Sequence, residues 1–86
     1  MSQFAEEVLK EYNPIIKRKT PSKDVSYRIR VVRRQLEGLP ITLVDIREYL
    51  VTEKRFGFTE SGIYVNKKEL DYLIKCLLEA KKEFFK

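Results

Sequence analysis

The sequence contains no histidine and only one cysteine, and these absences exclude several classes of protein. Without histidine, the usual zinc ligand sets and histidine-dependent catalysis are excluded. A lone Cys76 forms no intramolecular disulfide. No phosphate-cradling glycine loop is present, and no apolar run approaches the ~18 to 20 residues that span a bilayer. We therefore expect neither an enzyme, nor a protein with a metal or cofactor, nor a membrane protein.

The 86 residues carry 43% hydrophobic and 36% charged side chains, which is typical of one soluble globular domain with a small core. The opening residues, MSQFAEEVLKEY, carry acids where a signal peptide has basic residues before an apolar stretch. We therefore expect the protein to stay inside the cell.

Basic residues are concentrated in one part of the chain. Residues 14–34 hold eight lysines and arginines against one acid, Asp24, so this segment has a net charge of +7 and the other 65 residues have −2. A basic block of this kind is typical of polyanion binding, and nucleic acid is the commonest polyanion. From charge alone, a solvated basic surface that aids solubility is an equally good interpretation.

Spacing and prolines set the first 24 residues apart from the rest. Apolar residues at intervals of four predict a short helix over residues 3–12. Two prolines then bracket an extended or irregular basic segment over residues 14–21. We assign residues 1–24 to an N-terminal short helix and basic arm, and residues 25–86 to the main domain.

From Val25 onward the pattern changes to an alternation of period two, which predicts strands. The first two, residues 25–34 and 41–51, each have an apolar and a polar face. Residues 52–59 pass through a basic turn into a short third strand, and residues 62–65 form a fourth. We expect an antiparallel meander of four strands.

An amphipathic helix follows the strands. Asn66, with Glu69 three residues later, has the pattern of an N-cap with a capping box, so we predict a helix beginning at Lys67. A small sheet covers only part of such a helix, and we expect a second copy to cover the rest. The predicted fold is therefore α+β: a curved four-stranded antiparallel sheet followed by a long C-terminal helix that mediates homodimer formation. The predicted dimer interface contains Leu70, Leu73, Ile74, Leu77, Leu78 and Phe84.

The polar faces of the predicted strands combine arginines with an aromatic ring. Positive charge follows phosphates with release of counterions, and flat rings receive unstacked bases. This combination predicts binding of single-stranded nucleic acid without readout of base sequence. The residues are Arg28, Arg30, Arg34, Arg47 and Tyr49.

Two linked motifs resemble a known family. The string VDIREYLV, followed 13 residues after its Tyr49 by GIYVNKKELDYL, is similar to the signature of the transcriptional coactivator family called positive cofactor four. The similarity covers roughly residues 25–78. It implies a homodimer with helices packed between the protomers and with basic sheet channels that bind single-stranded DNA or melted duplex. It also implies a non-enzymatic role in transcription regulation, in the nucleus or at another site of DNA transcription or replication, in contact with that machinery.

Some residues carry over from the family position by position. Arg47 matches the strand arginine that contacts the sugar-phosphate backbone, and Arg34 falls near the basic residue that ends the first strand. Leu50 stands where the animal coactivator has tryptophan, and Ser61 stands where a lysine is usual. These departures remove one stacking surface and one charge, which residues of the basic turn can replace. The replacements are Lys54, Arg55, Phe56 and Phe58.

Other interpretations of the same residues stay open. Arg28 and Arg30 can serve to protect an edge strand, and Arg47 can pair with Glu48 or Asp45 of a neighbouring strand instead of phosphate. The alternative function is a dimeric interaction module whose basic sheet docks acidic segments of transcription or replication factors. A third interpretation is recognition of double-stranded DNA or RNA by the basic arm. The sequence leaves DNA or RNA open as the working ligand.

Overall fold

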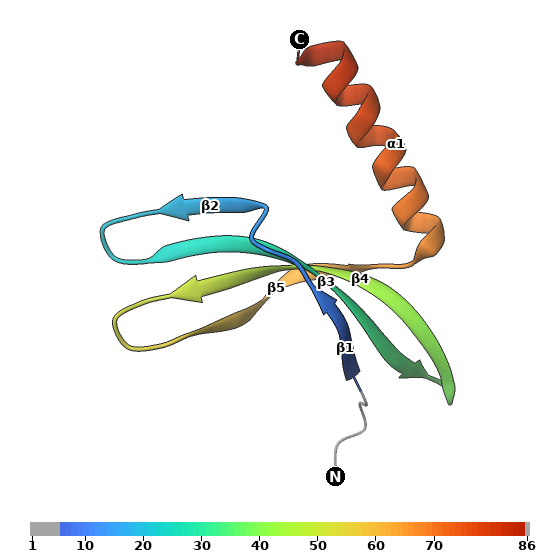
Figure 1. Ribbon diagram of the computed structural model, residues 1–86, viewed down its shortest axis with the longest axis horizontal. Coiled ribbons are helices and arrows are strands. Elements are labelled where there is room, and N and C mark those ends of the chain that lie inside the picture. The colour runs from blue at the N-terminus through green and yellow to red at the C-terminus, as the bar shows by residue number, and fades with distance from the viewer. Residues whose placement is uncertain (1–5, 86) are drawn as a thin grey trace.

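Five strands and one helix make up the computed structural model, which describes residues 6–85 (Figure 1). The strands form a single antiparallel sheet that is not closed. The predicted α+β class is confirmed, but the sheet has five strands instead of four. In chain order the elements are β1 (Glu6–Glu11), β2 (Ile16–Lys19), β3 (Asp24–Leu36), β4 (Leu39–Val51), β5 (Phe56–Val65) and α1 (Lys67–Phe84).

The long hairpin of β3 and β4 forms the centre of the sheet. The two strands have 13 residues each and pair along their whole length. The turn between them consists of Glu37 and Gly38, whose φ angles are 50° and 82°. Positive φ at both central residues is what a tight two-residue hairpin turn requires, and glycine adopts it at little cost.

The N-terminal segment forms strands. β1 pairs with the second half of β3 and β2 with its first half, so the two short strands lie end to end along one edge. The predicted helix over residues 3–12 is therefore wrong for residues 6–11, and residues 3–5 lie outside the described residues. A spacing of four residues is common to helices and strands. The edge of β3 decides between them, because its backbone groups need partners.

Asn13 and Pro14 separate β1 from β2. Proline has no N–H group to donate to a sheet. The amides of Tyr12 and Ile15 on either side donate to carbonyls of β3, both at 2.9 Å. The predicted arm therefore belongs to the same sheet as the strands that follow it.

β5 joins the predicted third and fourth strands into one. Its pairing with β4 is irregular between Arg47, which lies opposite Gly62, and Tyr49, which lies opposite Phe58. β5 thus has extra residues at 59–61, which form a bulge. The bulge breaks the alternation of apolar and polar residues, and for this reason the sequence pattern predicted a gap between two strands.

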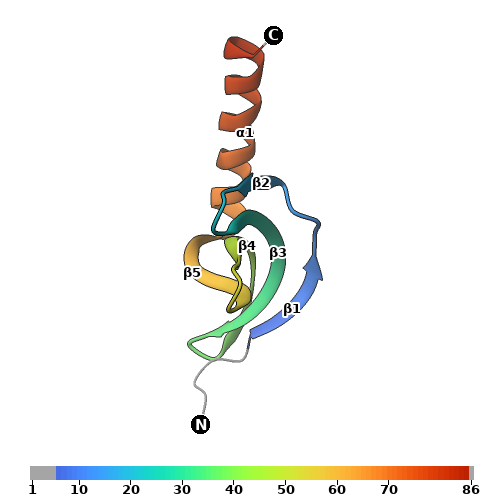
Figure 2. The ribbon, with the colours of Figure 1, turned by 90° about the vertical axis from the view of Figure 1, so that its left-hand side faces the viewer.

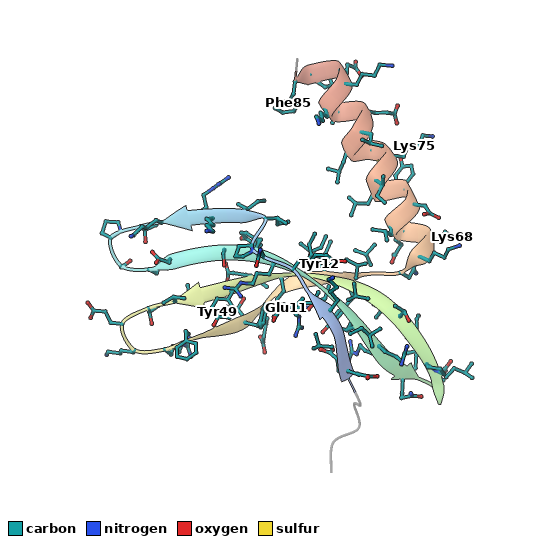
Figure 3. The ribbon with its side chains drawn as sticks, viewed as in Figure 1. Glu11, Tyr12, Tyr49, Lys68, Lys75 and Phe85 are labelled. Atoms are coloured by element: carbon teal, nitrogen blue, oxygen red, sulfur yellow. The ribbon has the colours of Figure 1, made fainter. Side chains whose placement is uncertain are left out.

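The helix α1 begins at the predicted residue. The Asn66 side chain accepts from the Glu69 amide and the Glu69 carboxylate accepts from the Asn66 amide, both at 2.9 Å. The helix then extends away from the sheet and contacts mainly β4 (Figure 2). Lys68 and Lys75 extend from one side of it and Phe85 from the other (Figure 3). No helix in residues 6–85 is long and apolar enough to cross a bilayer.

Very little apolar surface is fully buried. Among the described residues, only Val32 and Val65 are buried apolar side chains. The helix leaves many large apolar side chains in solvent, including Leu78 at 62% and Phe84 at 74% exposure. One copy of the chain therefore lacks a complete core.

Candidate nucleic-acid interface

Side chains from three strands meet on one face of the sheet, called here the polar face. In the pairing of β3 with β4, Arg28 lies opposite Arg47 and Arg30 lies opposite Asp45. Directly opposite residues point to the same side of a sheet. By the same register, seven of the nine predicted contact residues share this face: Arg28, Arg30, Arg34, Arg47, Tyr49, Phe56 and Phe58.

The polar face is the concave side of the sheet. The Tyr64 hydroxyl on β5 donates to the Glu6 carboxylate on β1 at 3.0 Å. These strands lie on opposite sides of the central hairpin, so the contact requires the sheet to curl toward the polar face. Figure 2 shows this curvature. The candidate interface is thus an open trough.

Asp45 lies at the floor of the trough and has no exposed surface. The Nε–H of Arg30 donates to its Oδ2 at 3.0 Å, and the Nε–H of Arg47 donates to its Oδ1 at 2.9 Å. A buried carboxylate needs such partners to offset its loss of water. The hydrogen bond to Asp45 also raises the pKa of Arg47. The sequence interpretation paired Arg47 with an acid of a neighbouring strand, whereas in the structure Arg47 pairs with Asp45 of its own strand.

Glu6 brings a second carboxylate to the same end of the trough. Its oxygens lie 3.5 Å from Nη2 of Arg30 and 3.6 Å from Nε of Arg34. Burial raises the pKa of the Tyr64 hydroxyl, and its hydrogen bond to Glu6 raises it further. This half of the polar face therefore holds its arginines in ion pairs within the protein.

Gly62 makes room for Arg47. A Cβ atom at Gly62 would lie 2.7 Å from the Ile46 carbonyl oxygen and 3.0 Å from Cζ of Arg47. Only glycine fits at such distances without a shift of the backbone. At the neighbouring bulge, the Thr59 carbonyl accepts from Nη1 of Arg47 at 3.2 Å. Sequence reasoning missed Gly62 as part of the site and named Asp45 only as an alternative partner of Arg47, although both lie within the two linked motifs.

On the polar face, arginine guanidinium groups lie over aromatic rings. Such cation–π contacts hold each arginine in one orientation. A guanidinium plane is a flat group on which a base can stack. Phe56 also lies on this face, but it is 77% exposed to solvent. The distances from Cζ to the ring centroid are 4.1 Å for Arg28 on Tyr49, 4.5 Å for Arg30 on Phe58, and 4.9 and 5.0 Å for Arg34 and Arg47 on Tyr64.

Lys54 and Arg55, the other two predicted residues, lie in the β4–β5 turn. Both are exposed, and the Thr52 amide closes the turn by donating to the Arg55 carbonyl at 2.8 Å. Arg55 and Phe56 line an open hollow of about 570 Å³. The turn lies at the same end of the sheet as the β2–β3 turn, because the start of β3 pairs with the end of β4 (Figure 1).

The position of β3 decides one open interpretation. β3 has partners on both sides, with β1 and β2 along one edge and β4 along the other. Arg28 and Arg30 are therefore on a central strand. The interpretation that they protect an edge strand is wrong.

The predicted dimer residues form one stripe along α1. Leu70 and Leu73 are half-buried near the sheet, whereas Ile74, Leu77 and Leu78 are exposed. The structure thus brings them to one side of the helix, and the exposed part of the stripe faces solvent in a single copy.

Comparison with models of known families, with curated proteins and with solved structures finds no match for this chain. The likeness to the positive cofactor four family therefore depends on the two linked motifs alone. Within residues 6–85, no group of three or more potential metal-ligating side chains occurs.

Proposed function

We propose that this protein binds single-stranded DNA without base specificity and is not an enzyme. The observation that supports this best is the gathering of four arginines and three rings from three strands on one concave face. The likeness to the positive cofactor four family supports the same activity. It is also the sole support for a role in transcription.

The chemistry of the trough favours a single strand over a duplex. Guanidinium groups that lie on rings offer flat surfaces to bases and N–H donors to phosphates. A duplex keeps its bases stacked and shows only their edges in the grooves. A flexible single strand can bring both its phosphates and the faces of its bases into the trough.

The carboxylates in the trough do not remove its capacity to bind phosphate. Each guanidinium has five N–H donors, and Asp45 and Glu6 engage only some of them. The remaining donors can point outward. The acids reduce the charge at one end of the trough, and this predicts tighter contact with phosphates at the other end.

We propose further that the working unit is a homodimer. Isolated small domains rarely leave a stripe of leucines and phenylalanines in water. Here Leu77, Leu78 and Phe84 are all exposed on one helix that extends beyond the sheet. A second copy supplies a matching apolar surface through a self-complementary interface.

Fluorescence anisotropy with a labelled oligonucleotide of about 20 bases and its matching duplex tests the function. We expect the single strand to bind about tenfold more tightly than the duplex. If each protomer neutralises four to six phosphates, the slope of log K against log salt is about −3 to −4 for the single strand. Equal binding of both forms, or an affinity that does not change with salt, contradicts the proposal. An acidic peptide in the same assay tests the interaction-module alternative, and an RNA of the same sequence tests the choice of nucleic acid.

A further inference from the structure

β2 directs two lysines onto the polar face. Lys17 lies opposite Ser26 and Lys19 lies opposite Asp24 in the pairing with β3. Ser26 in turn lies opposite Tyr49 of β4, which places all of these side chains on the concave side of the sheet. The basic segment is thus a strand of fixed register that adds positive charge to the candidate interface.

These lysines border an open hollow, called here the β2 hollow. Lys17, Lys19, Ser26, Arg28 and Tyr49 are among its lining residues, and its volume is about 380 Å³. This volume lies within the range of sites that bind small ligands or parts of larger ones.

Arg28 differs from the arginines at the opposite end of the trough. Within the described residues it has no carboxylate partner, and its buried Nε has no hydrogen-bond partner. The guanidinium is held over the Tyr49 ring at 4.1 Å. Its charge is therefore fixed in place and not neutralised, whereas Asp45 and Glu6 neutralise Arg30 and its neighbours.

We infer that the β2 hollow binds a phosphate of the single-stranded nucleic acid. This inference rests on the proposed function and names the part of the interface that holds the strand most tightly. Two lysines and two arginines, Lys17, Arg18, Lys19 and Arg28, line the hollow, against the single carboxylate of Asp24. A phosphate in the hollow receives charge-assisted hydrogen bonds from these groups, while the base next to it lies near Tyr49.

The test compares the double variant Lys17→Ala/Lys19→Ala with the control Lys68→Ala/Lys75→Ala. The control removes two exposed lysines from the polar side of α1, so the change in net charge is the same. Binding of the oligonucleotide is measured across a range of salt concentrations, and thermal melting verifies that both variants fold. The oligonucleotide is used with a 5′-hydroxyl and with a 5′-phosphate, which separates an internal phosphate from a terminal one.

We expect the β2 variant to lower the magnitude of the salt slope by about 0.7, because one phosphate contact is lost. Its affinity falls by about tenfold or more at 0.1 M salt, and the control keeps the parent slope. Arg28→Ala weakens binding in the same direction. If the parent protein binds the single strand and the two double variants bind equally, the inference is wrong and the proposed function stands. A loss confined to duplex DNA likewise overturns the inference alone. If the parent protein does not bind the single strand, the inference fails together with the proposed function.

Discussion

The Nε–H group of Arg47 donates to both carboxylate oxygens of Asp45, at 2.9 and 3.1 Å. The two residues are two positions apart on β4, so their side chains share one face. Arg30 reaches the same carboxylate from β3. One buried acid thus orients two of the arginines proposed to contact DNA, and it ties the central strands together through their side chains.

Replacement of Asp45 by asparagine should destabilise the fold. Asp45→Asn leaves two largely buried guanidinium groups without their shared counter-charge, and removal of one partner of a buried ion pair costs about 3 kcal/mol or more. Urea denaturation at fixed protein concentration measures the change. The control is Asp24→Asn, an exposed aspartate at the start of β3, for which we expect a change within about 0.5 kcal/mol. Equal stability of the two variants would show that the cluster does not stabilise the sheet.

Replacement of Arg47 should weaken binding of the single strand. Arg47→Ala removes a cation from the concave face, and we expect a loss of about fivefold in affinity with a smaller salt slope. Arg33→Ala serves as the control, because Arg33 lies on the opposite face and pairs with Glu7 at 3.3 Å. Anisotropy titrations of both variants make the comparison, with circular dichroism as the test of folding. Similar losses in both would indicate that net charge alone, and not the trough, governs binding.

Charges placed in the apolar stripe of α1 should separate the protomers. The parent chain is expected at about twice its 10.3 kDa mass by light scattering after gel filtration. Leu77→Glu/Leu78→Glu places two carboxylates where an apolar surface is needed, and desolvation of these charges disfavours association. Lys68→Glu, which by the 3.6-residue period lies on the opposite side of the helix from Leu77, should leave the mass unchanged. A parent protein of single-chain mass would contradict the dimer directly.

Stability should fall at alkaline pH as Tyr64 ionises. Its pKa is raised in the folded chain, by burial and by the hydrogen bond to Glu6. Its contribution is therefore complete below the unfolded-state pKa of about 10 and is lost as the pH rises through the folded-state pKa. Tyr64→Phe should reduce this loss between pH 10 and higher values in thermal melts. Tyr12→Phe changes an exposed tyrosine outside this hydrogen bond, so it is the control and should retain the loss.

The sequence by itself determined the features that depend on neighbours along the chain. The capping box of Asn66 and Glu69 fixed the start of α1, because both hydrogen bonds are local. The alternation along β3 and β4 placed Arg28, Arg47 and Tyr49 on one face, because a strand has a period of two. Most of the candidate interface was predictable for this reason.

Only the tertiary structure decided what depends on distant partners. Residues 6–11 became a strand because the edge of β3 offered backbone partners, a fact that local spacing does not contain. The curl of the sheet brought Glu6 to Tyr64 across 58 residues and placed carboxylates beside the arginines at one end. At the other end, near Lys17 and Lys19, Arg28 forms no ion pair with a carboxylate among residues 6–85. Which arginines are neutralised thus follows from the packing of the strands, because ion pairs depend on distance in space and not on distance along the chain.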